Sequence, residues 1–438
     1  MIKTFCCILT FYALLSPAFS SIAQTQPWKK LQSPVNATLR YLTFVDSLTG
    51  WAAGEAGTII RTTNGGDSWE IQNSTVQTFI MDIFFIDENS GWALTLKDVF
   101  PFNSVILKTT NRGDDWHTKN FPDSSALIRT IFFFDSLNGF AGGSNISYTS
   151  DGGNIWIKSD VDSNFFSNYP IYKFNFYNRQ FGYACGGRID LAGVVWRTTN
   201  AGLNWAAQGI SADEVFDIFI LDSLNAITLS GDPEGLYPIA NIKTTNTGVT
   251  WNFENLPFFG LSFTIDFRTY NEGWSASGYK FLLTTNRGET WNEFETPDSA
   301  VIYDLQFTDA RTGYAVGENG VILKLDPTLV EVENYSDFPD GFILYQNYPN
   351  PFNPNTKIIF ALPGVETSHA SSLQIVTLKV YDVLGNEIAT LVNKELPAGE
   401  YEVGFSPESS IKHPASGIYF YRLNAGGIIR TKKMIYLK

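Results

Sequence analysis

The stretch T-T-N-G-G-D-S-W, residues 62–69, decides the fold of this chain. Its pattern, T-T-N-x-G-x-x-W, recurs at Thr109–Trp116, Thr198–Trp205, Thr244–Trp251 and Thr284–Trp291, with a variant at Thr149–Trp156. The tryptophans of successive copies are separated by 47, 40, 49, 46 and 40 residues. A repeat of this length predicts one small supersecondary unit that is used many times.

A second signature precedes each of these motifs. It consists of an apolar run, a polar residue and a Gly-aromatic-Ala segment, and its copies begin at Gly50, Gly91, Gly139, Gly182, Ala226 (degenerate), Gly273 and Gly313. The apolar runs fit innermost strands, and the later segments supply three more strands in each repeat of about 40–45 residues, which is the blade of a β-propeller. We therefore predict an all-β chain with a seven-bladed propeller over residues 24–328.

The seventh repeat has no T-T-N-x-G-x-x-W motif after residues Val321–Lys324. Trp28 lies 41 residues before Trp69, which is the length of one repeat. We expect the segment Gln26–Leu31 to supply the missing outer strand and so close the ring, since an open array would leave strand edges unpaired.

The repeated motif predicts a tight turn. An Asn or Asp side chain can bond nearby backbone groups, a glycine can adopt positive φ, and the tryptophan can pack on its own blade or the next one. The structural residues of this motif are Asn64, Gly66, Trp69, Asn111, Gly113, Trp116, Asp151, Gly153, Trp156, Asn200, Gly202, Trp205, Asn246, Gly248, Trp251, Asn286, Gly288 and Trp291.

The motif resembles the Asp-box, or BNR repeat, with Asn in place of Asp in all copies but the one at Asp151. Sialidases carry such boxes on the outer rim, but they also need an arginine triad and a tyrosine nucleophile, for which this sequence shows no pattern. Over about residues 40–325 the repeats more closely resemble the photosystem II assembly and stability factors. That resemblance implies a binding scaffold and no catalysis.

Composition narrows the class of protein further. Lys3 and the apolar run Phe5–Leu15, followed by Ser21-Ile22-Ala23, predict a signal peptide over residues 1–23, and no later run is long enough for a transmembrane segment in the mature chain. Its removal takes Lys3 and no acid, which leaves a net charge of 29 − 44 = −15 and argues against nucleic-acid partners. Cys185 is then the only cysteine, so an internal disulfide is impossible.

The last hundred residues form a different domain. Residues 329–341 are predicted to be a linker, and residues 342–438 contain L-Y-Q-N-Y-P-N-P-F-N-P (344–354), L-K-V-Y-D-V-L-G (378–385), S-G-I-Y-F-Y-R-L (416–423) and K-K-M-I-Y-L-K (432–438). Alternating strands predict a small Ig-like β-sandwich. The motifs closely resemble the C-terminal sorting domain of the type IX secretion system. This implies the secretion machinery as a partner, export through the periplasm, and a secreted or cell-surface location; an ordinary adhesion module is the alternative.

Catalytic chemistry finds little support in the sequence. The propeller contains one histidine, His117, so neither a Ser-His-Asp triad nor a histidine-rich metal site is expected. The run Asp160–Asn164 begins like a calcium loop but lacks the glycine and glutamate that such a loop needs. We predict no cofactor, no metal and no catalytic residue. The alternative is a secreted glycoside hydrolase with a carboxylate pair in a cleft of the propeller.

Loop length indicates where a ligand would bind. Three connections between second and third strands are long: Leu96–Asn103, Gly187–Gly193 and Gly231–Ala240. They bring the candidate ligand-binding residues Arg188, Asp190, Asp232, Glu234 and Tyr237 to one rim, although drifted surface insertions would look the same. Phe165, Phe166, Tyr169, Phe258 and Phe259 either add aromatic contacts on that face or pack the blades. The predicted function is non-catalytic recognition of an unknown protein or glycan.

Overall fold

The computed structural model describes residues 27–97, 103–124, 126–326, 343–347, 349–362, 374–396, 399–407, 415–425 and 428–437. The chain divides into two compact units, Met1–Val330 and Glu331–Lys438. The predicted signal peptide and the predicted linker lie outside the described residues. Within the described parts, no helix has the length and apolar character that crossing a membrane requires.

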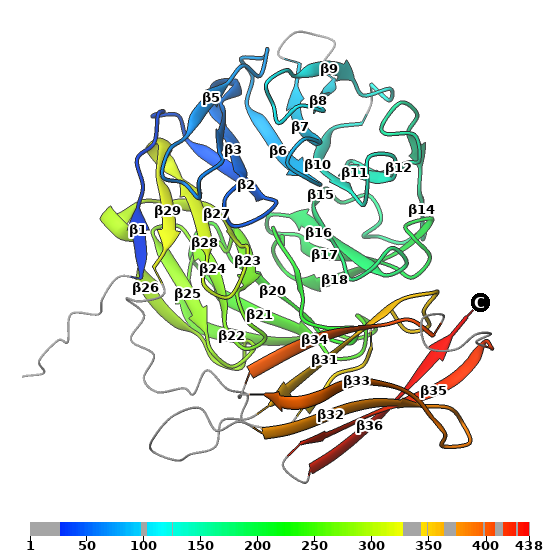
Figure 1. Cartoon of the computed structure of the whole chain (residues 1–438). Coiled ribbons are helices and arrows are strands. Elements are labelled where there is room, and N and C mark those ends of the chain that lie inside the picture. Colours follow the sequence, from blue (N-terminus) through cyan, green and yellow to red (C-terminus); the bar gives the residue numbers. More distant parts are fainter. Residues whose placement is uncertain are drawn as a thin grey trace, which may run out of the picture. The chain divides into compact units, whose positions relative to one another are not determined.

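Seven sheets make up the first unit, each with four antiparallel strands, and one of them has a fifth strand that pairs in parallel (Figure 1). Blade 1 consists of β2 (Leu39–Phe44), β3 (Gly50–Gly54), β4 (Ile59–Thr62) and β5 (Glu70–Gln72). Blade 2 consists of β6 (Ile80–Phe85), β7 (Gly91–Leu96), β8 (Ser104–Thr109) and β9 (His117–Asn120). Blade 3 consists of β10 (Ile128–Phe133), β11 (Gly139–Gly143), β12 (Ile146–Thr149) and β13 (Ile157–Lys158). Blades 4 and 5 are β15 (Ile171–Phe176), β16 (Gly182–Arg188), β17 (Ala192–Thr198), β18 (Asn204–Ser211); and β19 (Phe219–Ile220), β20 (Ala226–Ser230), β21 (Pro238–Thr244), β22 (Asn252–Phe259). Blade 6 is β23 (Thr264–Phe267), β24 (Gly273–Ser277), β25 (Lys280–Thr284), β26 (Asn292–Glu295), and blade 7 contains β27 (Ile302–Phe307), β28 (Gly313–Gly317) and β29 (Ile322–Leu325). Three short 3-10 turns, Glu55–Gly57, Pro297–Ser299 and Glu318–Gly320, complete the unit.

Blade 7 takes its outer strand from the other end of the unit. Strand β1 (Trp28–Lys30) pairs with β29, with Trp28 opposite Leu325 and Lys29 opposite Lys324. Figure 1 shows the dark blue β1 beside the yellow β29. The Trp28 ring stacks on Phe281 at 4.9 Å and contacts Trp274 edge-on at 5.7 Å, so it also joins blade 7 to blade 6. The pairing is the one that the repeat spacing predicts.

Two details of the strands differ from the expected pattern. The apolar run of the fifth repeat, Val215–Leu221, predicts a full innermost strand, but only Phe219–Ile220 is paired in the ladder. An additional strand, β14 (Asp160–Val161), pairs in parallel with β18 and gives blade 4 a fifth strand. The segment Asp160–Asn164 is therefore part of a blade edge and the connection after it.

The repeated motif builds the same turn in all six copies. In the first, the Thr62 hydroxyl oxygen accepts a hydrogen bond from the Gly66 amide at 2.9 Å, and Asn64 Oδ1 accepts one from the Ser68 amide at 3.0 Å. Gly66 has φ 86°, which a residue with a Cβ rarely adopts. Trp69 then contacts Phe44 and packs in a cluster that includes Tyr314 of blade 7, so the turn anchors an interblade contact.

Carboxylate and amide side chains tie neighbouring innermost strands together. Asp82 of blade 2 accepts hydrogen bonds from the Thr130 hydroxyl and the Ile131 amide of blade 3 at 2.9 and 2.8 Å. Asp304 of blade 7 accepts one from the Leu42 amide of blade 1 at 2.9 Å. Asp217 and Asp266 make equivalent contacts with blades 6 and 7. These side chains satisfy backbone groups that no ladder reaches.

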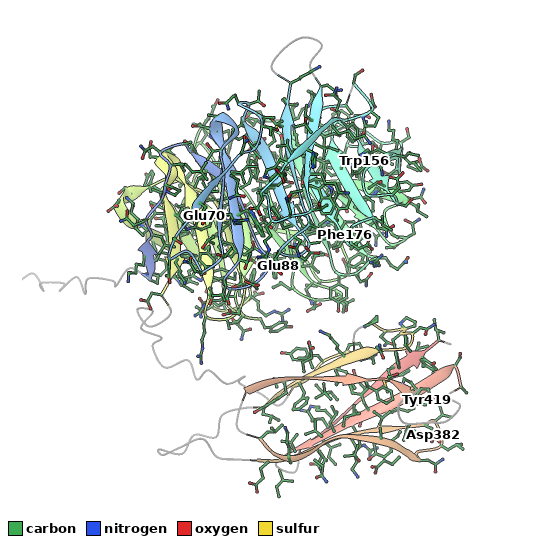
Figure 2. All side chains as sticks on the ribbon, turned by 45° about the horizontal axis from the view of Figure 1, so that its top comes forward. Glu70, Glu88, Trp156, Phe176, Asp382 and Tyr419 are labelled. Atoms are coloured by element: carbon green, nitrogen blue, oxygen red, sulfur yellow. The ribbon has the colours of Figure 1, made fainter. Side chains whose placement is uncertain are left out.

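The second unit is a two-sheet sandwich. One sheet contains β30 (Ile343–Leu344), β31 (Thr356–Leu362) and β34 (Gly399–Phe405); the other contains β33 (Glu387–Leu396), β32 (Gln374–Tyr381), β35 (Gly417–Ala425) and β36 (Ile428–Tyr436). Side chains fill the space between the two sheets (Figure 2), and Phe360, Leu378, Tyr421 and Tyr436 are among those fully buried there. The predicted all-β fold class, a seven-bladed propeller followed by a small sandwich, is confirmed.

Candidate functional site

The antiparallel order of each blade separates its connections onto two faces. Turns between the first and second strands and the repeated motif lie on one face, which we call the turn face. Turns between the second and third strands and connections from one blade to the next lie on the opposite face, which we call the loop face. All three long loops singled out from the sequence belong to the loop face, although residues 98–102 of the first lie outside the described part of the chain.

The structure places the five predicted ligand-binding residues on the loop face of blades 4 and 5. Arg188 and Asp190 lie between β16 and β17, whereas Asp232, Glu234 and Tyr237 lie between β20 and β21. Arg188, Asp190, Glu234 and Tyr237 are exposed, with Tyr237 at 68% of its possible exposure. These four side chains are free to meet a ligand.

Asp232 has a different position. It is buried, and its carboxylate accepts hydrogen bonds from the backbone amides of Glu234, Leu236 and Tyr237 at 2.6–2.9 Å. These bonds hold the pKa of the Asp232 carboxyl below its ordinary value despite burial, which favours the neutral form. Asp232 fixes the loop that presents Leu236 and Tyr237.

Exposed apolar side chains gather on the same part of the loop face. We call this set the apolar crescent, and it consists of Phe165, Ile189, Leu191, Leu236, Tyr237, Phe259 and Tyr279, on blades 4 to 6 and the connections that join them. Of the other described residues on the loop face, Leu127 alone is an exposed large hydrophobic side chain. Exposed apolar patches of this kind mark interaction surfaces in soluble proteins.

Several contacts hold the loops that carry the crescent. Phe165 contacts Phe166 and Tyr169 at 5.3 and 5.8 Å, and the Arg188 guanidinium lies over the Tyr169 ring at 5.8 Å. The Asp190 amide donates to Asp213 Oδ1 at 2.7 Å, and the Ser230 hydroxyl donates to the Asp213 carbonyl at 3.0 Å. At the far end Pro238 pairs with Phe259. Of the five aromatic residues weighed from the sequence, Phe165 and Phe259 are exposed, whereas Phe166, Tyr169 and Phe258 pack inside the blades.

A collar of aromatic and arginine side chains surrounds the central opening on the loop face, and the sequence analysis did not identify it. Five of its members are the second residues of innermost strands, Arg40, Met81, Arg129, Tyr172 and Tyr303, and the other two, Phe216 and Phe263, lie just before β19 and β23. Tyr172 stacks on Phe216 at 5.4 Å, Phe263 contacts both Phe216 and Tyr303, and the Arg40 guanidinium lies 3.9 Å from the Tyr303 ring centroid. Aligning the seven innermost runs would have exposed this position.

Glu214 lies between the collar and the crescent. It is 3% exposed, and its Oε2 has no hydrogen-bond partner. Burial raises the pKa of the Glu214 carboxyl, and the negative charges of Asp213 and Asp190 raise it further, against one backbone hydrogen bond. A buried oxygen without a donor is rare in folded proteins and marks a position where a ligand group can supply one.

A second set of charged residues on or beside the innermost strands consists of Lys173 and the carboxylates Asp82, Asp217 and Asp304. Burial alone would lower the pKa of Lys173, but the carboxylates of Asp304, Asp217 and Asp82 outweigh it and raise that pKa. Among the described residues, no group of three or more His, Cys, Asp or Glu side chains is placed to hold a metal ion. The second unit contains hollows of about 540 Å³ beside Phe405 and about 230 Å³ beside Tyr381.

The fold defines a repeat propeller followed by a sandwich domain. Residues 20–121 match the family model of the photosynthesis system II assembly factor YCF48, and residues 346–437 match the model of the secretion system C-terminal sorting domain. The chain thus combines a β-propeller of the Ycf48 type with a type IX secretion sorting domain, as its motifs predicted.

Individual proteins agree with this assignment. The photosystem II assembly protein Ycf48 of Thermosynechococcus vestitus is 34% identical over 64 residues, which is 14% of this chain and 18% of that protein. A solved structure of YCF48 bound to D1 peptide superposes with a TM-score of 0.54 at 19% identity, covering 69% of this chain and 97% of the other. The GH74 xyloglucanase of Xanthomonas campestris superposes with a TM-score of 0.51 at 11% identity, over 76% of this chain and 59% of the enzyme. At these identities both superpositions establish the fold alone.

Proposed function

We propose that the protein is a secreted or cell-surface propeller that binds a protein or glycan ligand without catalysis, through the loop face of blades 4 to 6. The apolar crescent is the observation that carries this proposal. A large exposed apolar surface on a rigid scaffold is costly to leave in water and is typical of a recognition surface. The similar structure of YCF48 bound to D1 peptide supports a binding role for this kind of propeller.

The domain organisation follows from the same proposal. A signal peptide over residues 1–23 would start export to the periplasm, the propeller over residues 24–328 would be the cargo, and residues 329–341 would link it to the sorting domain at 342–438. The match of residues 346–437 to a sorting domain implies export and supports contact with the secretion machinery. The propeller would then be released or retained at the outer surface.

A glycoside hydrolase is the second candidate function, and Glu214 is the observation that favours it. A carboxyl with a raised pKa can act as the general acid of glycoside hydrolysis, and Asp190 and Asp213 lie close to it. Hydrolysis of a polysaccharide also needs a cleft that holds the chain across two carboxyl groups.

A hydrolysis screen separates these two functions. The purified protein, the Glu214→Gln variant and the Asp190→Asn variant are incubated with a panel of polysaccharides that includes xyloglucan, and released reducing ends are measured. We expect no turnover by any of the three proteins. Turnover by the original protein that falls by two or more orders of magnitude in Glu214→Gln would refute the non-catalytic function.

A further inference from the structure

Acidic side chains outnumber basic ones in and around the apolar crescent. The described segments that carry it, 162–170, 187–193, 231–237, 256–262 and 278–279, together with the adjoining segment 211–214, contain six carboxylates and one cation: Asp162, Asp190, Asp213, Glu214, Asp232 and Glu234, against Arg188. If all were ionised, their net charge would be 1 − 6 = −5. Asp213, Glu214 and Asp232 are buried, whereas Asp162, Asp190 and Glu234 are exposed, so exposed apolar side chains and negative charge share one surface.

The two features demand a particular kind of partner. Leu236, Tyr237 and Phe259 would be buried by an apolar surface, while Asp190 and Glu234, which are exposed in the adjacent loops, would be paired by cations. Complementary charge steers association and selects among partners that offer similar apolar area. A polyanion, an acidic glycan or an anionic lipid surface would be repelled here.

Glu214 supplies an independent observation. Its Oε2 is buried and receives no hydrogen bond, and its electrostatic neighbours are the carboxylates Asp213 and Asp190. An ammonium or guanidinium group bound at the exposed Asp190 would offset the repulsion between the three acids. The loop face at Asp190 therefore favours a cation.

We propose that the apolar crescent binds a protein partner through a cationic amphipathic segment, whose apolar face covers Leu236, Tyr237 and Phe259 and whose lysine or arginine side chains pair with the exposed Asp190 and Glu234, beside the buried Glu214. This inference rests on the proposed binding function and adds the chemistry of the ligand. Aromatic residues at the centre of such an interface contribute most of its affinity, and the surrounding charges set the rate and specificity of association.

The test uses two model peptides with the same pattern, one of leucine and lysine and one of leucine and glutamate, titrated into the full protein by calorimetry at two salt concentrations. We expect the leucine–lysine peptide to bind at least tenfold more tightly than the leucine–glutamate peptide, and to lose affinity as salt rises. Tyr237→Ala and Glu234→Lys should each weaken its binding by about tenfold, whereas Leu48→Ser and Leu137→Ser, at exposed leucines on the turn face, should leave it unchanged.

The outcomes discriminate between the inference and the function on which it rests. Equal affinity for the two peptides, no effect of Glu234→Lys, or no binding of the leucine–lysine peptide would overturn the inference. Weakening by Tyr237→Ala together with equal affinity for both peptides would overturn only the charge preference and leave the loop face as the binding surface. Weakening by the turn-face variants and not by Tyr237→Ala would contradict the proposed function as well.

Discussion

Replacing Asp82 by asparagine should change how the stability of the propeller depends on pH. Asp82 is 8% exposed, and its Oδ2 accepts hydrogen bonds from Thr130 and Ile131 of the next blade. Burial raises the pKa of its carboxyl from 3.8 to about 6, even though Lys173 and these hydrogen bonds act in the opposite direction. The folded protein therefore holds the Asp82 proton more tightly than the unfolded chain does.

The sign and size of the effect follow from linkage. Because the folded pKa lies above the unfolded one, the stabilising contribution of the proton is complete below pH 3.8 and disappears as the pH rises through about 6. The full shift corresponds to about 3 kcal/mol, and the part lost between pH 5 and pH 8 is about 1.4 kcal/mol. The carboxyls of Asp266 and Asp304 also have raised pKa values, that of Asp266 at about 7. Their contributions to the stability of the protein therefore also decrease as the pH rises.

Urea unfolding followed by tryptophan fluorescence measures this effect on the propeller alone, because all 11 tryptophans lie in it. The original protein should have a higher free energy of unfolding at pH 5 than at pH 8, and Asp82→Asn should reduce that difference by about 1.4 kcal/mol. Asp87→Asn is the matched control, since Asp87 is exposed in the turn after β6. Stability that rises from pH 5 to pH 8, or an undiminished difference in Asp82→Asn, would refute the reasoning.

Three further outcomes follow from the same structure. Trp28→Ala should lower the free energy of unfolding by about 3–5 kcal/mol, because the ring is 2% exposed between blades 6 and 7. Trp28→Phe should lower it by less than half as much. Equal decreases for the two variants in urea unfolding would contradict this packing. Asn200→Ala should lower the free energy of unfolding by about 1 kcal/mol, because it removes the Oδ1 that accepts a hydrogen bond from the Asn204 amide. Asn200→Asp keeps an acceptor at this position and should keep the stability, as judged by the urea midpoint of each variant. If Asn200→Asp loses as much stability as Asn200→Ala, other groups hold the turn. Deleting residues 428–438 should abolish export in a host with the secretion system, because β36 and the fully buried Tyr436 complete the sandwich. Export is measured by immunoblot of the culture medium and the cell surface. Normal export of the deletion variant would show that recognition does not need this strand.

The fold could be predicted in detail because its determinants are local and repeated. Each copy of T-T-N-x-G-x-x-W builds its turn from bonds within a few residues, as Thr198, Asn200 and Gly202 show. The strand at Val215 was overestimated because an apolar run does not reveal which of its residues are paired in a ladder. Strand β14 was missed because its two residues have no pattern of their own and are held by β18.

The site was predicted only in outline. Loop length placed Arg188, Asp190, Glu234 and Tyr237 correctly on one face, but it could not show that Asp232 is occupied by three backbone amides. The collar brings together Arg40, Tyr172 and Tyr303 from strands far apart in the chain, so no short motif contains it. No sequence pattern singles out Glu214, because its lack of a hydrogen-bond donor arises from its burial beside Asp213.

Closure of the ring is the claim on which the blades, the loop face and the crescent all depend, and a disulfide tests it directly. Lys29 and Lys324 are paired residues on neighbouring antiparallel strands, where Cα atoms lie close enough for a disulfide, and the native Cys185 is buried. After oxidation, mass spectrometry of a digest of Lys29→Cys/Lys324→Cys should find the two peptides joined in most molecules, and those of Lys29→Cys/Lys243→Cys separate. Cross-linking of the first pair no higher than that of the second would contradict the closed seven-bladed ring.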